Sequence, residues 1–469
     1  MRIQCTNGTP ILDTLDHLPP LPLHVEYRHF STGKDDLGIC HPLRFHDRVC
    51  YVYLHLSSSI LHECLMVMAN HFPILEDLSL MSNVDSSTAL TLPKAFLAPN
   101  LRCLALSGIG LPKRLRLLAS TISLVKLTLW DIQASSYFRP RLIVARLRSL
   151  PQLEQLAIGF SVPIPRPSTE RELLGEQGTP ATLPNLNTLA FQGVSVYLES
   201  FIAQIRAPAL KWLYITLYNQ IAFTLQHLCH FINTTEGLEI PVVKVSFWYD
   251  SIYVTTSNSA WLDAPFFIQV KCWPLDWQID CAAQVCTALA PALLVSDVEK
   301  FILDVYDYAV KWPDGEIDET TWHELLRSFV GMKELRIETG LLQELASALR
   351  MDELRSDPGF LLDLQEIVAA RNLFTSFIDT RQVVGRPVRF SPLLDSSGDF
   401  VEEVHMRENP ELPPVPTLSE RPRTKSSGAP SNRRPSTPTS AGEHDHGWSA
   451  YLTDNHKSTH CQRPPGDRP

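Results

Sequence analysis

The sequence predicts an α/β repeat fold in which short parallel strands alternate with helices. Two observations lead to this prediction. The apolar phrase Leu-x-x-Leu-x-(Leu, Ile or Phe) returns at intervals of 23 to 33 residues, and apolar stripes with helical spacing lie between its copies. A strand plus a return segment of this length is the unit of a leucine-rich repeat. We therefore predict a leucine-rich-repeat solenoid, a curved parallel sheet with helices on its convex side.

The phrase has six clear copies. Their first anchors are spaced by 26, 23, 29, 33 and 24 residues and are Leu75, Leu101, Leu124, Leu153, Leu186 and Leu210. Alternation of the later anchors, such as Leu78 and Leu80, predicts a short strand with one buried face. Pro stands two positions before the first anchor in most copies, where it ends the preceding return segment. Weaker copies begin at Val49, Val243, Ile268, Val298, Met332 and Leu364.

Apolar stripes at positions i, i+3, i+4 and i+7 predict helices between the strands. They fall at residues 61–68, 225–232, 282–289, 322–329 and 342–349. A single unit cannot bury its own stripe, so a neighbouring unit must cover it, which contributes roughly 1.5–3 kcal/mol per fully buried Leu or Phe. We interpret these residues as core packing.

Changes in composition divide the chain into three regions. Residues 1–45 are expected to form an irregular leader or cap with one strand at 23–27, and residues 46–392 the leucine-rich-repeat domain. Residues 393–469 are rich in Pro, Ser and Arg and too poor in apolar residues to order themselves, which predicts a disordered tail. A Pro/Gly-rich insertion at 163–182 should protrude as a loop.

The charge of the chain excludes some classes of partner. Its formal net charge of -10 argues against general binding to nucleic acids or anionic membranes. One basic run, residues 113–116, is either a local patch or, as we favour, a solvated helix face. No apolar stretch reaches the ~18–20 residues of a membrane-spanning helix, and the N-terminus lacks the apolar core of a secretory signal. We expect reduced cysteines and a cytoplasmic or nuclear location.

Motifs that carry catalysis or bind cofactors were not found. The sequence has no GxxxxGK[ST], GxSxG or HExxH motif. The groupings closest to a metal site are His62-Glu63-Cys64, Cys229-His230 and His444-Asp445-His446. The first two lie in helical stripes and the third in the tail, so we expect no metal site. The prediction is a protein that is not an enzyme and needs no cofactor.

A binding surface is predicted on the concave face of the sheet. Residues between the strand anchors point away from the return helices. Large aromatic side chains on such a face are typical interface anchors. The alternative is that loops or return helices cover them. The candidate partner-binding residues are Asp77, Lys126, Thr128, Trp130, Gln155, Trp212 and Tyr214.

A resemblance to a known family rests on the order of several phrases. They are His46-Asp47-Arg48-Val49, Leu75-Glu76-Asp77-Leu78, Leu210-Lys211-Trp212-Leu213, Leu275-Asp276-Trp277-Gln278, Ala283-Gln284-Val285-Cys286 and Phe377-Ile378-Asp379-Thr380-Arg381-Gln382. From about residue 46 to 390, roughly three quarters of the chain, the sequence resembles the repeat region of the F-box-like proteins of mushroom-forming fungi.

The resemblance implies a substrate-receptor subunit. In that family an N-terminal F-box would bind the linker protein of a cullin-RING ubiquitin ligase, and the repeats would hold a target. An F-box normally begins with a Leu-Pro-x-Glu phrase followed by helices, whereas residues 18–23 are too rich in proline for a helix. The resemblance therefore extends only to the repeat module of that family and not to its F-box.

Four hypotheses for function follow. The first is a protein-interaction scaffold that holds an unknown protein ligand. The second is a substrate receptor of a cullin-RING ubiquitin ligase with a degenerate or missing F-box, which would co-purify with the linker protein. The third is an enzyme with an unrecognised site, and the fourth is a truncated gene product.

Overall fold

The computed structural model describes residues 3–6, 19–28, 37–82, 90–112, 116–164, 179–218, 222–238, 242–248, 250–256, 264–272, 276–295, 298–305, 319–329, 331–338, 340–349 and 360–393. The chain divides into two units, 1–404 and 405–469, and all described residues lie in the first. The predicted tail from residue 394 onward and residues 165–178 of the predicted loop lie outside the described residues.

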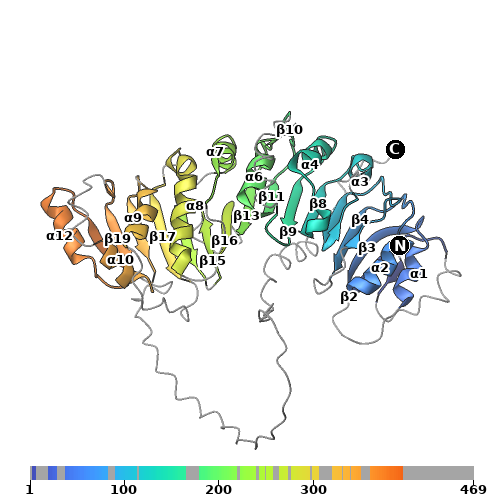
Figure 1. Cartoon of the computed structure of the whole chain (residues 1–469), viewed down its shortest axis with the longest axis horizontal. Coiled ribbons are helices and arrows are strands. Elements are labelled where there is room, and N and C mark those ends of the chain that lie inside the picture. Colours follow the sequence, from blue (N-terminus) through green and yellow to red (C-terminus); the bar gives the residue numbers. More distant parts are fainter. Residues whose placement is uncertain are drawn as a thin grey trace, which may run out of the picture. The chain divides into compact units, whose positions relative to one another are not determined.

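One large sheet organises the first unit (Figure 1). Its sixteen described strands begin with β1 and end with β20 as free edges, so the sheet does not close into a barrel. In sheet order they are β1 (Ile3–Cys5), β2 (Leu23–Arg28), β3 (Val49–Leu56), β4 (Asp77–Ser82), β6 (Cys103–Ser107), β8 (Lys126–Ile132), β9 (Gln155–Phe160), β11 (Thr188–Gly193), β13 (Trp212–Tyr218), β16 (Phe266–Lys271), β15 (Ser251–Thr255), β14 (Val242–Phe247), β17 (Lys300–Val305), β18 (Glu334–Ile337), β19 (Glu366–Ala369) and β20 (Arg389–Pro392).

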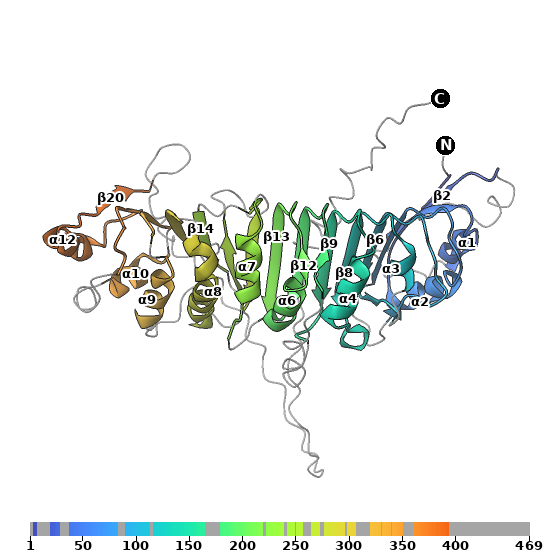
Figure 2. The same ribbon diagram turned by 90° about the horizontal axis from the view of Figure 1, so that it is seen from above.

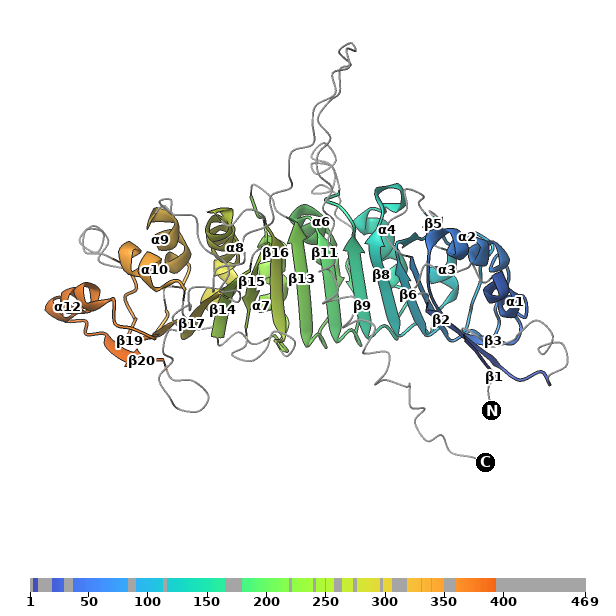
Figure 3. The ribbon, with the colours of Figure 1, turned by 90° about the horizontal axis from the view of Figure 1, so that it is seen from below.

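Helices cover one face of this sheet. From α2 to α9 they lie along the same side (Figure 2), and the strands are uncovered in the view from the opposite side (Figure 3). Successive helices contact one another from α3 to α10, so each return segment covers its neighbour. The ten helices of the described residues are α1 (Cys40–Leu43), α2 (Ser58–Val67), α3 (Arg116–Ser120), α4 (Pro140–Leu147), α6 (Ser195–Ile202), α7 (Gln226–Asn233), α8 (Asp276–Val295), α9 (Glu319–Arg327), α10 (Leu342–Ala348) and α12 (Thr375–Val383).

The anchors of the six clear phrases line up across the sheet. Their middle anchors are successive Cα partners in parallel strands, and each is at most 1% exposed: Leu78, Leu104, Leu127, Leu156, Leu189 and Leu213. All six belong to one hydrophobic core beneath the helices. Because side chains alternate along a strand, this register sends every anchor to the covered face. The predicted α/β class and the parallel pairing of these strands are confirmed.

The strand order departs from chain order at one place. β13 pairs with β16, while β15 runs antiparallel between β16 and β14. Residues 248–250 join β14 to β15, and the Trp248 N–H donates to the Ser251 carbonyl at 2.9 Å. A parallel crossover needs a dozen or more residues, so this short connection forces a hairpin. The sheet is therefore mostly parallel, not wholly parallel as the sequence predicted.

The first residues of the chain also belong to the sheet. Residues 1–45 were expected to form an irregular leader or cap with one strand; in the structure β1 and β2 pair in parallel and β2 pairs with β3. The predicted strand at 23–27 coincides with β2.

One buried carboxyl joins two successive return segments. Glu199 in α6 is 1% exposed and accepts hydrogen bonds from the His227 and Leu228 N–H groups at 2.7 and 2.9 Å. Leu225 at the N-cap of α7 has no side-chain acceptor, so Glu199 satisfies the first turn of that helix in its place. Burial raises the pKa of Glu199, and the same amide hydrogen bonds act in the opposite direction.

We predict that Glu199→Ala lowers the free energy of unfolding by about 1–3 kcal/mol, because it leaves buried N–H groups without an acceptor. Urea denaturation followed by circular dichroism measures the change. The matched control is Glu236→Ala, since Glu236 is exposed. Equal stabilities of the two variants would contradict the capping role.

Candidate functional site

The face of the sheet opposite the helices carries the predicted binding residues. We call it the open face. Alternate strand positions project onto it, between the anchors that point into the core. One row of Cα partners across the open face is Asp77, Cys103, Lys126, Gln155, Thr188 and Trp212. The next row is Ser79, Ala105, Thr128, Ala157, Ala190, Tyr214 and Phe267.

All seven predicted residues lie on strands of this sheet, but they differ in exposure. Thr128 and Tyr214 are buried, at 7% and 5% exposure. The alternative that return helices cover the face does not apply to the strands shown in Figure 3, because the helices lie on the other side. The five half-buried residues are Asp77, Lys126, Trp130, Gln155 and Trp212.

Aromatic side chains from three adjacent strands, and from the residue that follows β14, form a continuous group in the middle of the open face. We call it the aromatic strip and define it as Trp212, Tyr214, Phe267, Tyr253 and Trp248. The Trp212 and Tyr214 rings are nearly parallel, with centroids 6.5 Å apart. Phe267 meets Tyr214 at 6.3 Å and Tyr253 at 5.5 Å, and Trp248 meets Tyr253 at 5.4 Å.

The strip has a packed floor and two more accessible ends. Phe267 is fully buried and Tyr253 is 9% exposed, whereas Trp212 and Trp248 are half-buried. Ring pairs at 4.5–7 Å contribute about 0.5–1.5 kcal/mol each beyond burial. Because the floor is packed in this way, the two tryptophans are held in place and little side-chain entropy remains to be lost on binding.

Polar side chains next to the strip hold its buried residues in place through hydrogen bonds. The Gln269 amide donates to the Tyr253 hydroxyl at 3.1 Å, and the Thr216 hydroxyl donates to the Gln269 amide oxygen at 3.2 Å. In the neighbouring strands Tyr218 donates to the Phe160 carbonyl at 2.5 Å, and Gln192 donates to the same carbonyl at 3.0 Å. Buried polar groups with partners of this kind rigidify a surface.

Trp130 lies across a glycine of the next strand. A Cβ at Gly159 would lie 2.7 Å from the Trp130 ring, so only glycine leaves room for it. Asp131 has a φ of 51°, an uncommon value that coincides with a register shift between β8 and β9. The Ser107 hydroxyl donates to Asp131 at 2.7 Å and supports this backbone. Trp130 is thus positioned by the irregular backbone at Asp131 within β8 and not by the aromatic strip.

A desolvated ionic group lies toward the N-terminal end of the open face. Burial raises the pKa of Asp77 to about 7, although the nearby Lys126 and a hydrogen bond with Cys103 act in the opposite direction. Burial also lowers the pKa of Lys126. The Asp77 Oδ1 atom is buried without a hydrogen-bond partner. Burial therefore disfavours the charged forms of both Asp77 and Lys126, and their neighbours offset this cost only in part.

Ion pairs occupy the open face beyond the strip. Lys244 contacts Asp304 at 2.6 Å and Lys300 contacts Glu334 at 2.7 Å. Arg389 contacts Glu366 at 3.0 Å. Such pairs at a partly exposed surface contribute little to stability, about 0–1 kcal/mol each. Their charges already have partners within the sheet, so this end of the face is less suited than the strip to anchor a protein.

The sequence missed three members of the strip. Tyr253, Phe267 and Trp248 lie on or beside the strands that break the chain order, where the repeat phrase is weak. The weak copies at Val243 and Ile268 marked strands there, but the antiparallel hairpin of β14 and β15 and the pairing of β16 with β13 had no signature in the repeat spacing.

The described residues offer no group of three His, Cys, Asp and Glu side chains that could hold a metal. Of the groupings weighed from the sequence, Cys64 contacts Cys40 with sulfur atoms 3.4 Å apart, and the Cys229 thiol donates to the Ala288 carbonyl at 3.2 Å. The grouping at 444–446 lies outside the described residues. In the described part of the chain, no helix combines the length and the hydrophobicity needed to cross a membrane.

Comparison with known proteins gives no assignment. No protein-family model matches the chain, and no curated protein matches it.

We predict that the raised pKa of Asp77 makes stability fall as pH rises from about 4 to about 7. In this range the folded state keeps a proton that the unfolded carboxyl has released, so folding is favoured at the acidic end. The expected effect is about 2–4 kcal/mol. Urea denaturation at several pH values should show that the difference between the parent protein and Asp77→Asn changes over this range.

The matched control for this measurement is Gln152→Ala, because Gln152 is exposed and carries no titratable group. Its difference from the parent protein should be nearly independent of pH. A constant difference between parent and Asp77→Asn from pH 4 to 8 would refute the assignment of the shifted pKa.

Proposed function

We propose that this chain is a leucine-rich-repeat module that binds a partner protein through the aromatic strip. The repeat assignment is supported by the spacing of the six phrases and by the register of their anchors across parallel strands. From α3 to α10, the helix of each return segment packs on the next one. This arrangement leaves a sheet face free of helices, the surface that such repeats use for binding.

The observation that carries the proposal is the aromatic strip itself. Tryptophan and tyrosine are the residue types most enriched at the energetic centres of interfaces. Here two half-buried tryptophans stand at the ends of a packed aromatic floor, with partly exposed polar residues such as Gln155 and Lys126 on the same face. An apolar centre with a polar rim is the composition expected of a protein-binding surface.

A substrate-receptor role in a cullin-RING ubiquitin ligase is the more specific form of this proposal. It rests on the resemblance to the F-box-like proteins of mushroom-forming fungi. In that form the strip would hold the substrate, and the linker protein of the ligase would be among the proteins that co-purify. A partner set without the linker protein would leave the interaction module and remove the ligase role.

We predict that Trp212→Ala and Trp248→Ala each reduce recovery of the same partner by about thirtyfold or more, as expected when an interface loses an anchor worth at least ~2 kcal/mol. The measurement is affinity purification from cell extract with quantitative mass spectrometry. Circular dichroism melting curves check that the variants remain folded.

The matched control is Met66→Ala, which removes a large apolar side chain that is 67% exposed on α2, a helix of the covered face. Its partner set should equal that of the parent protein. Unchanged recovery of every partner by both tryptophan variants would rule out the strip as the binding surface.

A further inference from the structure

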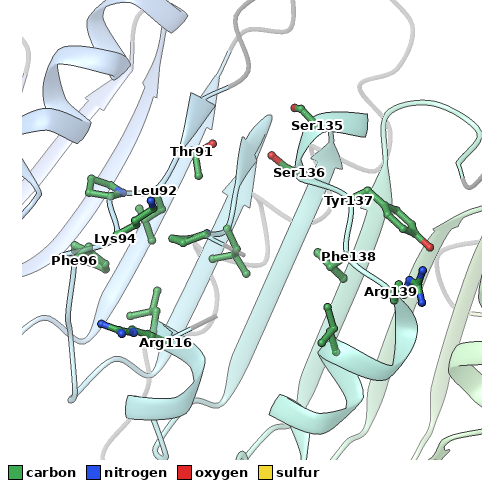
Figure 4. A pocket seen from close by; sticks show the side chains of 15 residues that line it. Thr91, Leu92, Lys94, Phe96, Arg116, Ser135, Ser136, Tyr137, Phe138 and Arg139 are labelled. Atoms are coloured by element: carbon green, nitrogen blue, oxygen red, sulfur yellow. The ribbon is translucent and has the colours of Figure 1, made fainter. Parts of the chain in front are cut away.

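A recess lies among the return segments (Figure 4), and none of its lining residues belongs to the aromatic strip. Its volume is about 940 Å³, at the upper end of the ~300–1,000 Å³ typical of small-molecule sites. The lining residues come from three consecutive return segments, those that follow β4, β6 and β8. Lys94 and Phe96 lie in the first, Arg116 begins α3 in the second, and Tyr137 and Phe138 precede α4 in the third.

The lengths of these three segments account for the recess. The corresponding anchor intervals are 26, 23 and 29 residues, so the middle segment is the shortest. The described part of its helix α3 has five residues, whereas α4 in the next segment has eight. A short segment between two longer ones covers less of its neighbours, and a space remains between them.

The third segment forms a rigid wall. A Cβ at Gly110 would overlap the Ser136 side chain, so the 3-10 turn Ala134–Ser136 packs directly on the backbone of β7 (Ile109–Gly110). Phe138 and Phe160 ring centroids are 6.1 Å apart, and the buried Tyr197 hydroxyl donates to the Phe138 carbonyl at 3.2 Å. Because these contacts hold the wall in place, a ligand would not have to order it on binding.

The lining has an unusual charge for this chain. Of its fifteen described residues, eight are apolar, four carry hydroxyl groups and three are cations, and none is Asp or Glu. The whole chain has a net charge of -10, so three cations without a lining carboxylate are a local reversal of sign. The cations are Lys94, Arg116 and Arg139, and Arg116 is the one described member of the basic run at 113–116.

The polar and apolar groups are also arranged in a way that suits an amphipathic ligand. Figure 4 shows Lys94 and Arg116 on the same side of the recess, beside Phe96, with Tyr137 and Phe138 on the opposite side. Lys94 and Arg116 are exposed, while Phe96 and Phe138 are buried. An apolar body could lie against the rings while an anionic group meets the two cations, and carboxylates and phosphates form strong charge-assisted hydrogen bonds with both types of side chain.

We propose that this recess binds a small amphipathic anion, with its carboxylate or phosphate group at Lys94 and Arg116 and its apolar body against Phe96, Leu117 and Phe138. The proposal does not depend on the aromatic strip. Its occupant is a free small molecule, because the recess is of small-molecule size and its charge complements one anionic group.

The probes are dodecanoate and dodecyl phosphate, titrated below their micelle-forming concentrations into the full chain in a calorimeter. We expect one of them or both to bind with one-to-one stoichiometry, and dodecanol and dodecyltrimethylammonium to bind at least tenfold more weakly. The double variant Lys94→Gln/Arg116→Gln should raise the Kd about tenfold or more, which corresponds to ~1.4 kcal/mol.

The matched control is Arg206→Gln/Lys211→Gln, which removes two exposed positive charges from another return segment and should leave the Kd within about twofold. A second test variant, Leu142→Glu, places a negative charge in the lining at a side chain that is 50% exposed, so the core is kept. It should also weaken binding at least tenfold.

Three results would overturn the proposal. They are no binding of either anionic probe below millimolar concentration, equal binding by the parent protein and Lys94→Gln/Arg116→Gln, and dodecanol binding as tightly as dodecanoate. The chain could also sediment with phosphatidylserine vesicles without binding the free probes. That result would overturn the proposal and show that the recess meets a lipid surface and not a free small molecule.

Discussion

The structure depends on the register of apolar anchors between neighbouring parallel strands. Leu78, Leu104 and Leu127 are successive Cα partners and are buried together under the helices. A shift of one residue would turn each anchor to the opposite face, because side chains alternate along a strand. Each fully buried Leu contributes roughly 1.5–3 kcal/mol. The register thus sets which side chains are available on the open face, and the binding residues follow from the packing residues.

Contacts between successive return segments stabilise the fold together with the pairing of the strands. A helix that covers its neighbour must also have its own end satisfied, and Glu199 does this for α7 from the preceding helix. Close approach elsewhere requires glycine, as at Gly159 under the Trp130 ring. These contacts link one segment to the next in the chain, so the core extends along the sheet without a single centre.

The part of the fold that could be predicted from sequence is the part that repeats. The spacing of Leu75, Leu101 and Leu153 predicted strands that pair in parallel, and Trp212 and Tyr214 were identified as side chains between anchors. The hairpin of β14 and β15 could not be predicted, because a period reports the length of a segment and not the position to which the chain returns. Phe267 became a neighbour of Tyr214, and Tyr253 a neighbour of Phe267, only through that non-local pairing. Burial of Asp77 also depends on neighbours contributed by other strands.

The two candidate surfaces both lie where the repeat is irregular. Where the phrases recur in regular order, each unit covers the next and small side chains such as Ala105 and Ala157 fill the open face. The strip arises where a hairpin places β15 and β14 beside β16 and β13 in the sheet, and the recess arises where a short return segment lies between longer ones. The change in strand order shapes the open face. The short return segment shapes the face that the helices cover, so the two candidate surfaces lie on opposite faces of the sheet. A partner on one surface would therefore leave the other accessible, and coupling between them would have to pass through the core of β9 and β11, the strands that separate β8 from β13.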